Sequence, residues 1–341
     1  MVANGVRKRI LITGGSGLIG RAVAERLLQN ANNDLKLQVR GASNARAVVG
    51  DSLDLTKLRL EEADFTRVGD REMRLLSKGA DIIVHAAGLV HQPDAPYQEY
   101  EVINVRATQL LAEAAVVNKV KTLIFLSSSA VYGPGPFDRI SEEGPLKAVT
   151  PYAVSKMTSE NFLQTIQGIP KIVILRPSLV FGEGDRGNLL SLMRNIKSNK
   201  YKHIGSADTA KSVIYSKDLA EAIYLCINNL PDGFHIFNVA NPEPMPVRQL
   251  ADSIAKCLRD SGLDVKKIAS VPEGVFRIGV KAAELFMQDK APISMDQVNK
   301  LTTTTTTNIG KLVAQTGFQP KTSLESALQK EIAWATENAL L

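Results

Sequence analysis

The sequence contains only two cysteines, Cys226 and Cys257, among 341 residues. Two widely spaced thiols cannot form the disulfide framework on which small secreted domains depend, and they are too few for a cysteine-based metal site. We therefore expect both to be buried free thiols, and we expect no metal centre.

Long apolar runs are also missing. No stretch approaches the ~20 consecutive apolar residues that a transmembrane helix needs, and residues 1–9 lack the apolar segment of a signal peptide. These absences predict a cytoplasmic protein with no membrane partner.

The chain has no block of charge of one sign. Its 41 Lys and Arg exceed its 35 Asp and Glu, which gives a net charge of +6, but the basic residues are dispersed. Proteins that bind nucleic acid usually gather such residues on one face. We expect no nucleic-acid partner, because a small anionic substrate explains the excess equally well.

The amino terminus contains the first informative pattern. Residues 8–13 (KRILIT) read as a short strand, and an amphipathic helical run follows at 21–28. Glycines stand between them at 14, 17 and 20. A strand, a glycine turn and a helix let a pyrophosphate approach the backbone at the positive end of the helix. This pattern predicts a nucleotide-binding unit.

Further strands and helices alternate along the chain. This alternation predicts the fold class α/β, with a Rossmann-type doubly wound parallel sheet. Because 341 residues exceed a typical domain of about 100 to 200 residues, we also expect a smaller mixed α/β lobe. The expected strands are 35–40, 81–85, 122–126 and 171–175, and the expected helices are 107–117, 152–167, 187–198, 247–258 and 324–336.

Tyr152 and Lys156 are four residues apart and share one face of a predicted helix. A phenol normally titrates near pH ~10, and a neighbouring ammonium favours its ionised form. We therefore expect Lys156 to lower the pKa of Tyr152 toward that of a working acid or base, which suits alcohol and carbonyl chemistry.

Five ordered motifs resemble the extended short-chain dehydrogenase/reductase family, and within it the nucleotide-sugar epimerases, dehydratases and ketoreductases. The likeness spans about residues 8–335 and implies an NAD(P)-dependent oxidoreductase acting on a nucleotide-diphosphate sugar. It also implies a homodimer formed by the helices at 107–117 and 152–167. The motifs are TGGSGLIG at 13–20, HAAG at 85–88, Ser128 with VYG at 131–133, Tyr152 with Lys156, and RP at 176–177.

The resemblance also divides the chain. Residues 1–178 are expected to form the dinucleotide-binding domain, to which part of 205–240 returns, and residues 179–341 mainly the substrate-binding lobe. The threonine run 302–307 is expected as a loop or strand edge, because hydroxyl side chains compete for backbone hydrogen bonds.

The family pattern assigns most of the site. It implies catalytic roles for Ser128, Tyr152 and Lys156, although Ser127 and Ser129 are chemically equivalent neighbours of Ser128. The residues expected to bind the cofactor are Gly14, Ser16, Gly17, Leu18, Ile19, Gly20, Arg40, Asp64, Phe65, Ala86, Ala87, Gly88, Asn104, Tyr152 and Lys156. The residues expected to bind the substrate are Ser129, Ser178, Asn188 and Lys211.

The end of the second predicted strand bears on the cofactor. An acidic residue there would bind the ribose 2′-hydroxyl of NAD, whereas an arginine accommodates the 2′-phosphate of NADP. This chain has Arg40, with Arg46 just beyond, so we favour NADP over NAD. The alternative is that Arg40 only stacks on the adenine.

The reaction remains open at this stage. Dehydratases of the family place an acidic pair directly after the catalytic serine or threonine, and Ser129 and Ala130 stand there instead. We favour an NADP-linked 4-ketoreductase. The alternatives are an NAD-dependent nucleotide-sugar 4-epimerase and a reductase of a hydrophobic ketone.

Overall fold

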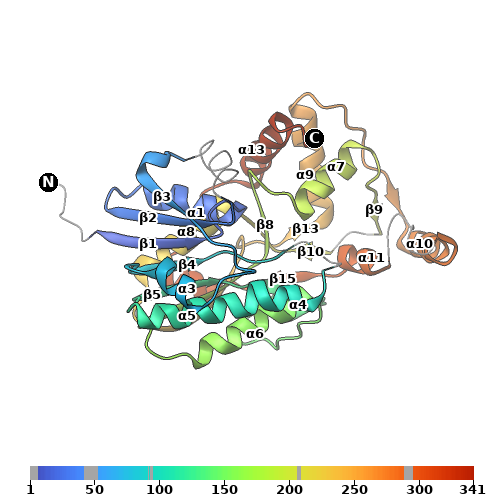
Figure 1. Cartoon of the computed structure of the whole chain (residues 1–341). Helices are drawn as coiled ribbons and strands as arrows, with labels where there is room; N and C mark the ends of the chain where they lie inside the picture. The colour runs from blue at the N-terminus through green and yellow to red at the C-terminus, as the bar shows by residue number, and fades with distance from the viewer. Residues whose placement is uncertain (1–6, 42–52, 91, 93–94, 206–208, 288–294) are drawn as a thin grey trace.

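The computed structural model describes residues 7–41, 53–90, 92, 95–205, 209–287 and 295–341. Its centre is a sheet of seven parallel strands in the order β12-β7-β5-β4-β1-β2-β3 (Figure 1). The strand order reverses between β1 and β4, and ligands of such sheets bind at this point, outside the carboxyl ends of the strands. The predicted fold class is confirmed. The strands are β1 (Lys8–Thr13), β2 (Asn33–Val39), β3 (Leu58–Glu62), β4 (Ile82–His85), β5 (Thr122–Leu126), β7 (Lys171–Pro177) and β12 (Gly233–Val239).

Helices cover both faces of this sheet because side chains alternate along each buried strand. Ile10 and Ile12 of β1 join one apolar cluster, and Leu11 between them joins the other. Cys226 and Cys257 are buried free thiols, as predicted. The first face carries α1 (Leu18–Leu28), α8 (Ser216–Asn229) and α12 (Gly310–Thr316), and the second carries α3 (Asp70–Ser77), α5 (Ala107–Val117) and α6 (Pro151–Thr165).

The helix before β5 is continuous but irregular. It begins as α4 (Tyr97–Tyr100), widens into the π-helical segment η2 (Glu101–Arg106) and continues as α5. Such π segments are rare and occur often at functional sites. This one contains Asn104, which is described with the site below.

A third apolar cluster lies beyond the carboxyl edge of the sheet, among α7 (Asn188–Lys197), α9 (Val247–Asp260) and α13 (Leu324–Glu337). Farther from the sheet lie α10 (Glu273–Met287) and α11 (Met295–Thr302) (Figure 1). A four-stranded sheet in the order β13-β10-β15-β6 connects these helices to the part built on the seven-stranded sheet. Its strands are β6 (Phe137–Ile140), β10 (Ala210–Lys211), β13 (Met245–Pro246) and β15 (Thr305–Thr307).

Two strand pairs complete the described fold. They are β8 (Leu179–Phe181) with β11 (Val213–Tyr215), and β9 (His203–Ile204) with β14 (Ser270–Val271). Two short 3₁₀ turns, η1 (Leu55–Lys57) and η3 (Ser129–Tyr132), precede β3 and follow β5. No helix within the described ranges is long and apolar enough to cross a membrane.

Residues 303–304 of the threonine run lie in a loop, as predicted, but residues 305–307 do not form a strand edge. Thr305–Thr307 forms β15, an inner strand between β10 and β6. The Thr306 hydroxyl accepts a hydrogen bond from the Arg139 nitrogen and donates to Asp138, both on β6, and the Thr305 hydroxyl accepts from Lys211 on β10.

Candidate active site

The glycine turn after β1 forms a cradle at the amino end of α1. Gly14 has a φ of +69°, and a Cβ atom on it would lie 2.8 Å from the backbone nitrogen of Ala87. A Cβ atom on Gly20 would lie 2.2 Å from the carbonyl oxygen of Gly14. Gly17 begins the helix without a side-chain cap, so the first-turn N–H groups point to the space outside the helix end. Small residues and free helix amides fit the pyrophosphate of a dinucleotide.

Gln38 braces this cradle, and the sequence analysis did not identify it. Its Oε1 accepts a hydrogen bond from the Gly14 nitrogen at 2.9 Å, and its Nε2 donates to the Ala63 carbonyl at 2.6 Å. Gln38 is buried near the end of β2. Because β2 also contains Asn33, Asp34 and Lys36, one more polar residue in this strand was not a distinguishing signal.

Arg40 follows β2 directly and is exposed at the carboxyl end of the sheet. Asp64 follows β3 and accepts hydrogen bonds from the backbone nitrogen and the hydroxyl of Thr66, at 3.0 and 2.9 Å. These bonds, and then the charges of Arg67 and Arg40, hold the pKa of Asp64 below its usual value. Phe65 is buried beside His85, with 6.1 Å between ring centroids. Arg46 lies outside the described residues.

The segment Ala86–Gly88 leads from β4 toward the reacting groups. A Cβ atom on Gly88 would lie 3.2 Å from both the Lys156 ammonium and the Asn104 amide oxygen. Asn104 is buried, and its amide binds both backbone groups of Leu89 and the Ser155 hydroxyl. Asn104 thus holds the backbone of this loop in its conformation.

Ser128 and Tyr152 are brought into contact. The Ser128 hydroxyl accepts a hydrogen bond from the Ala130 nitrogen at 3.1 Å, and it lies close enough to the Tyr152 phenol to lower the pKa of that phenol. Ser127 instead donates to the buried carboxylate of Glu160. The structure therefore distinguishes between neighbours that were equivalent in the sequence, since Ser128 is the serine that meets Tyr152.

The prediction that Lys156 lowers the pKa of Tyr152 is wrong when only the groups of the chain itself act on the phenol. Burial raises the pKa of Tyr152 to about 12, with the Ser128 hydrogen bond opposing it and Tyr100 adding to it. The Lys156 ammonium is turned to the Leu126 carbonyl, 2.8 Å away. Burial lowers the pKa of Lys156 to about 8, against the attraction of Glu160. Placement on one helix face did not fix where the long lysine side chain would point.

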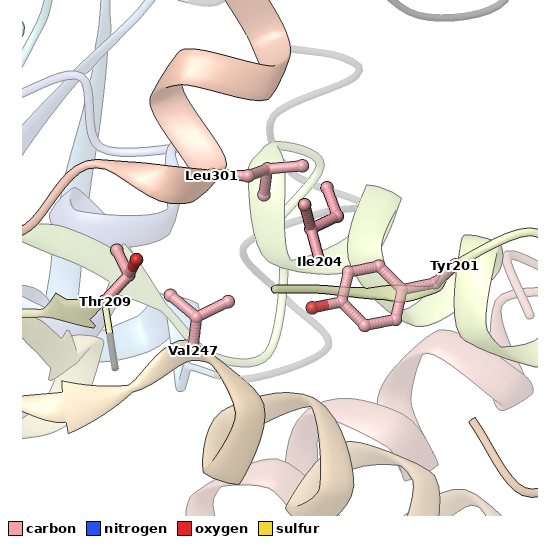
Figure 2. Close-up of a pocket in the computed structure, with 5 residues that line it drawn as sticks. All are labelled: Tyr201, Ile204, Thr209, Val247 and Leu301. Carbon is pink, nitrogen blue, oxygen red and sulfur yellow. The ribbon is translucent and has the colours of Figure 1, made fainter. Parts of the chain in front are cut away.

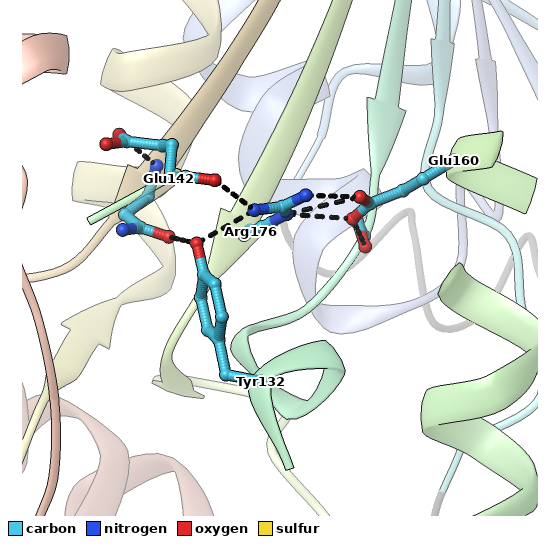
Figure 3. Close-up of polar contacts among 6 residues, drawn as sticks. Tyr132, Glu142, Glu160 and Arg176 are labelled. Carbon is cyan, nitrogen blue, oxygen red and sulfur yellow. Dashed lines mark hydrogen bonds and ion pairs between the residues drawn. The ribbon is translucent and has the colours of Figure 1, made fainter. Parts of the chain in front are cut away.

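A buried polar network lies beside these groups (Figure 3). Arg176 of β7 forms an ion pair with Glu160 of α6 at 2.6 Å and donates to the Tyr132 hydroxyl at 2.9 Å. Tyr132 in turn donates to Asn238 of β12 at 2.7 Å, and the Asn238 nitrogen donates to Glu142. The network joins α6 and η3 to two strands of the sheet.

The predicted substrate residues lie on separate elements. Asn188 is the first residue of α7, and Ser129 opens η3. Ser178 is 3.1 Å from the Thr307 hydroxyl. The Lys211 ammonium donates to the Thr303 carbonyl at 2.6 Å and to the Thr305 hydroxyl at 3.0 Å, and burial lowers its pKa to about 8.

A small pocket lies between α9 and α11, and no sequence pattern indicated it. Leu301 comes from α11 and Val247 begins α9. Figure 2 shows the side chains converging on one space. The lining residues are Tyr201, Ile204, Thr209, Val247 and Leu301.

The parallel sheet, the glycine cradle and the Ser128, Tyr152 and Lys156 motif define an extended short-chain dehydrogenase/reductase. Residues 10–240 match the NAD dependent epimerase/dehydratase family, and the chain belongs to that family.

Relatives extend over nearly the whole chain. An N-acetyl-alpha-D-glucosaminyl-diphospho-ditrans,octacis-undecaprenol 4-epimerase of Escherichia coli O157:H7 is 26% identical, covering 95% of this chain and 94% of the relative. A UDP-glucose 4-epimerase of Vibrio cholerae has the same identity and coverage. The crystal structure of UDP-glucuronic acid 4-epimerase from Bacillus cereus in complex with NAD superposes with a TM-score of 0.76 at 19% identity, over 97% of this chain and 99% of that one. This last likeness shows the fold.

Proposed function

We propose that the chain is an NADP-linked 4-ketoreductase of a nucleotide-activated sugar, with Ser128, Tyr152 and Lys156 at its reaction site. The observation that carries the proposal is the placement of the Ser128 side chain next to the Tyr152 phenol, whose pKa Ser128 lowers, in a molecule with a glycine-lined dinucleotide cradle. A hydroxyl pair of this kind can bind one carbonyl oxygen from two sides.

Tyr152 is the proton donor in this account. Its raised pKa keeps the phenol protonated at neutral pH, so it can give a proton to the oxygen of a ketone as that oxygen gains charge. Ser128 donates a hydrogen bond to the same oxygen and orients the sugar. Lys156, whose ammonium lies near Gly88, would hold the nicotinamide ribose. A bound nicotinamide supplies the hydride.

The residues next to Ser128 argue against dehydration. A 4,6-dehydratase needs an acid and a base that act at neighbouring carbons, and Ser129 and Ala130 supply neither a carboxylic acid nor a carboxylate. The reaction is therefore limited to hydride and proton transfer at one carbon.

Two arginines support NADP as the cofactor. Arg40 and Arg67 both act on the Asp64 carboxylate, so both lie near the carboxyl ends of β2 and β3. An arginine fork binds a phosphate through paired hydrogen bonds, which suits the additional 2′-phosphate of NADP.

A 4-epimerase that uses NAD is the second candidate. The family is named for NAD, and the two curated relatives above are 4-epimerases. The same Ser128 and Tyr152 would serve it, because epimerisation is an oxidation followed by a reduction from the other face. The two candidates differ in whether cofactor is consumed.

Lys211 and the start of α7 support a nucleotide diphosphate as the handle of the substrate. Lys211 supplies a cation, and Asn188 is the first residue of α7, where the positive end of the helix lies.

Two measurements test the proposal. Purified protein is mixed with 4-keto nucleotide sugars and either NADPH or NADH, and loss of reduced-cofactor absorbance is followed. The proposal predicts steady consumption with a preference for NADPH. Conversion of one nucleotide sugar into its 4-epimer without net consumption would show the epimerase instead.

The second measurement is thermal unfolding with UDP, dTDP or GDP in the presence of NADP. A nucleotide that binds the native state raises the melting temperature by mass action. If none of the three raises it, the nucleotide handle is wrong and a reductase of hydrophobic ketones becomes the better account.

A further inference from the structure

Glu160 is a fully buried carboxylate one helical turn after Lys156 on α6. It receives hydrogen bonds from the Arg176 guanidinium, with Nη2 to Oε2 at 2.6 Å (Figure 3), and from the Ser127 hydroxyl. Replacing a buried ion pair by apolar residues is often neutral or stabilising. Stability alone is therefore a weak reason for a carboxylate at this place.

The segment that Glu160 holds serves the reaction site. β5 ends at Leu126, whose carbonyl accepts the Lys156 ammonium at 2.8 Å. The next side chain, Ser127, bonds to Glu160, and the one after it, Ser128, lies next to the Tyr152 phenol. Fixing Ser127 thus fixes the residues on both sides of it, and each of them holds one of the reacting groups.

Glu160 also provides negative charge to Lys156. The other titratable group that acts on this ammonium is His85 from β4, which burial keeps neutral with a pKa of about 3. Arg176 faces Glu160 from β7 and is a cation. Among these groups only Glu160 favours the charged form of the lysine.

We propose that Glu160 is a positioning residue for the reaction. It holds Ser127 so that the Leu126 carbonyl and the Ser128 hydroxyl stay in place, and its charge keeps Lys156 as an ammonium. This inference deepens the proposed function and rests on it for the reaction that Tyr152 performs.

The first test is Glu160→Gln, which keeps the shape and removes the charge. Lys156 then loses its proton at lower pH, so the pH above which NADPH binding weakens should fall by about one unit, as followed by NADPH fluorescence. The kcat for ketone reduction should fall about 10- to 100-fold, because small displacements of reacting groups have effects of that size.

Ser127→Ala is the second test and leaves the charges in place. It should lower kcat about tenfold, leave the pH dependence of NADPH binding unchanged, and be rescued by Ser127→Thr, which restores the hydroxyl. Tyr132→Phe is the matched control. It removes a different hydrogen bond to Arg176, and we expect a lower melting temperature with a wild-type pH dependence.

The outcomes separate the two proposals. The inference is overturned if Glu160→Gln and Tyr132→Phe lower the melting temperature by similar amounts and neither shifts the pH dependence of NADPH binding. Glu160 would then be only structural. If Ser127→Ala reduces ketones at the wild-type rate, the positioning of Ser128 through Ser127 is wrong. Wild-type protein that reduces none of the keto sugars would refute the proposed function, while NADPH binding would still test Glu160.

Discussion

At the scale of single residues, burial shifts the pKa values of Tyr152 and Lys156 in opposite directions. The phenol is held neutral and can donate a proton, whereas the ammonium is held close to its point of deprotonation, with a pKa of about 8. A reductase needs the phenol protonated and the lysine charged, so its working range lies below the lysine pKa.

This difference predicts a pH dependence. The Lys156 ammonium is fully present below pH 7 and is lost as pH rises through its pKa of about 8. We expect kcat/KM for NADPH to decline above that pH, since a neutral amine binds the ribose hydroxyls more weakly. Initial rates from pH 6 to 10 check this, and a rate that keeps rising to pH 10 would contradict it.

Arg40 gives a second prediction at this scale. Arg40→Ser should raise the KM for NADPH about 10- to 100-fold and change the KM for NADH little, because charge-assisted bonds to a phosphate contribute about 1.5–3 kcal/mol. Arg59→Ser is the control, since Arg59 on β3 forms an ion pair with Asp34 on β2. Equal losses with both cofactors would mean that Arg40 does not contact the 2′-phosphate.

At the scale of elements, the cradle depends on the absence of a side chain where α1 meets the turn before it. Gly20→Ala would place a Cβ atom 2.2 Å from the Gly14 carbonyl oxygen, which is backbone and cannot rotate away. We expect the free energy of unfolding to fall by about 1–3 kcal/mol and cofactor affinity to fall at least about tenfold.

Gly41→Ala is the control for this change, because a Cβ atom on Gly41 meets nothing within 4 Å. Urea unfolding should place it within about 0.5 kcal/mol of the wild type. Similar losses for the two variants would show that crowding at the cradle is not the cause.

The elements also show what the sequence could and could not predict. β5 and α5 begin and end where the pattern placed them, because each is a clear apolar run between turn signals. β12 was missed, since Gly233, His235 and Asn238 interrupt its apolar pattern and its pairing with β7 is a long-range contact. The direction of the Lys156 side chain and the role of Gln38 depend on neighbours distant in sequence, so local spacing did not fix them.

At the scale of the whole molecule, α5 and α6 lie side by side on one outer face (Figure 1). We propose that two copies pair through these helices. Light scattering after gel filtration should give about twice the chain mass of 37.0 kDa. Val117 is 52% exposed at the end of α5, and Val117→Glu should shift the protein toward the monomer. A single-chain mass for the wild type would refute the pairing.

The central claim is that the glycine cradle, the Ser128 and Tyr152 hydroxyls and the substrate-binding residues act together in one reaction at a sugar carbon. It is tested most directly by following deuterium from NADPH labelled at the transferring position of the nicotinamide into a 4-keto nucleotide sugar. We predict one deuterium at C4 of the sugar with the wild type. With Tyr152→Phe we predict a rate lower by about 10²- to 10⁴-fold at unchanged NADPH affinity. Deuterium transfer at the wild-type rate by Tyr152→Phe, or no label in the sugar although NADPH and nucleotide both bind, would contradict the account.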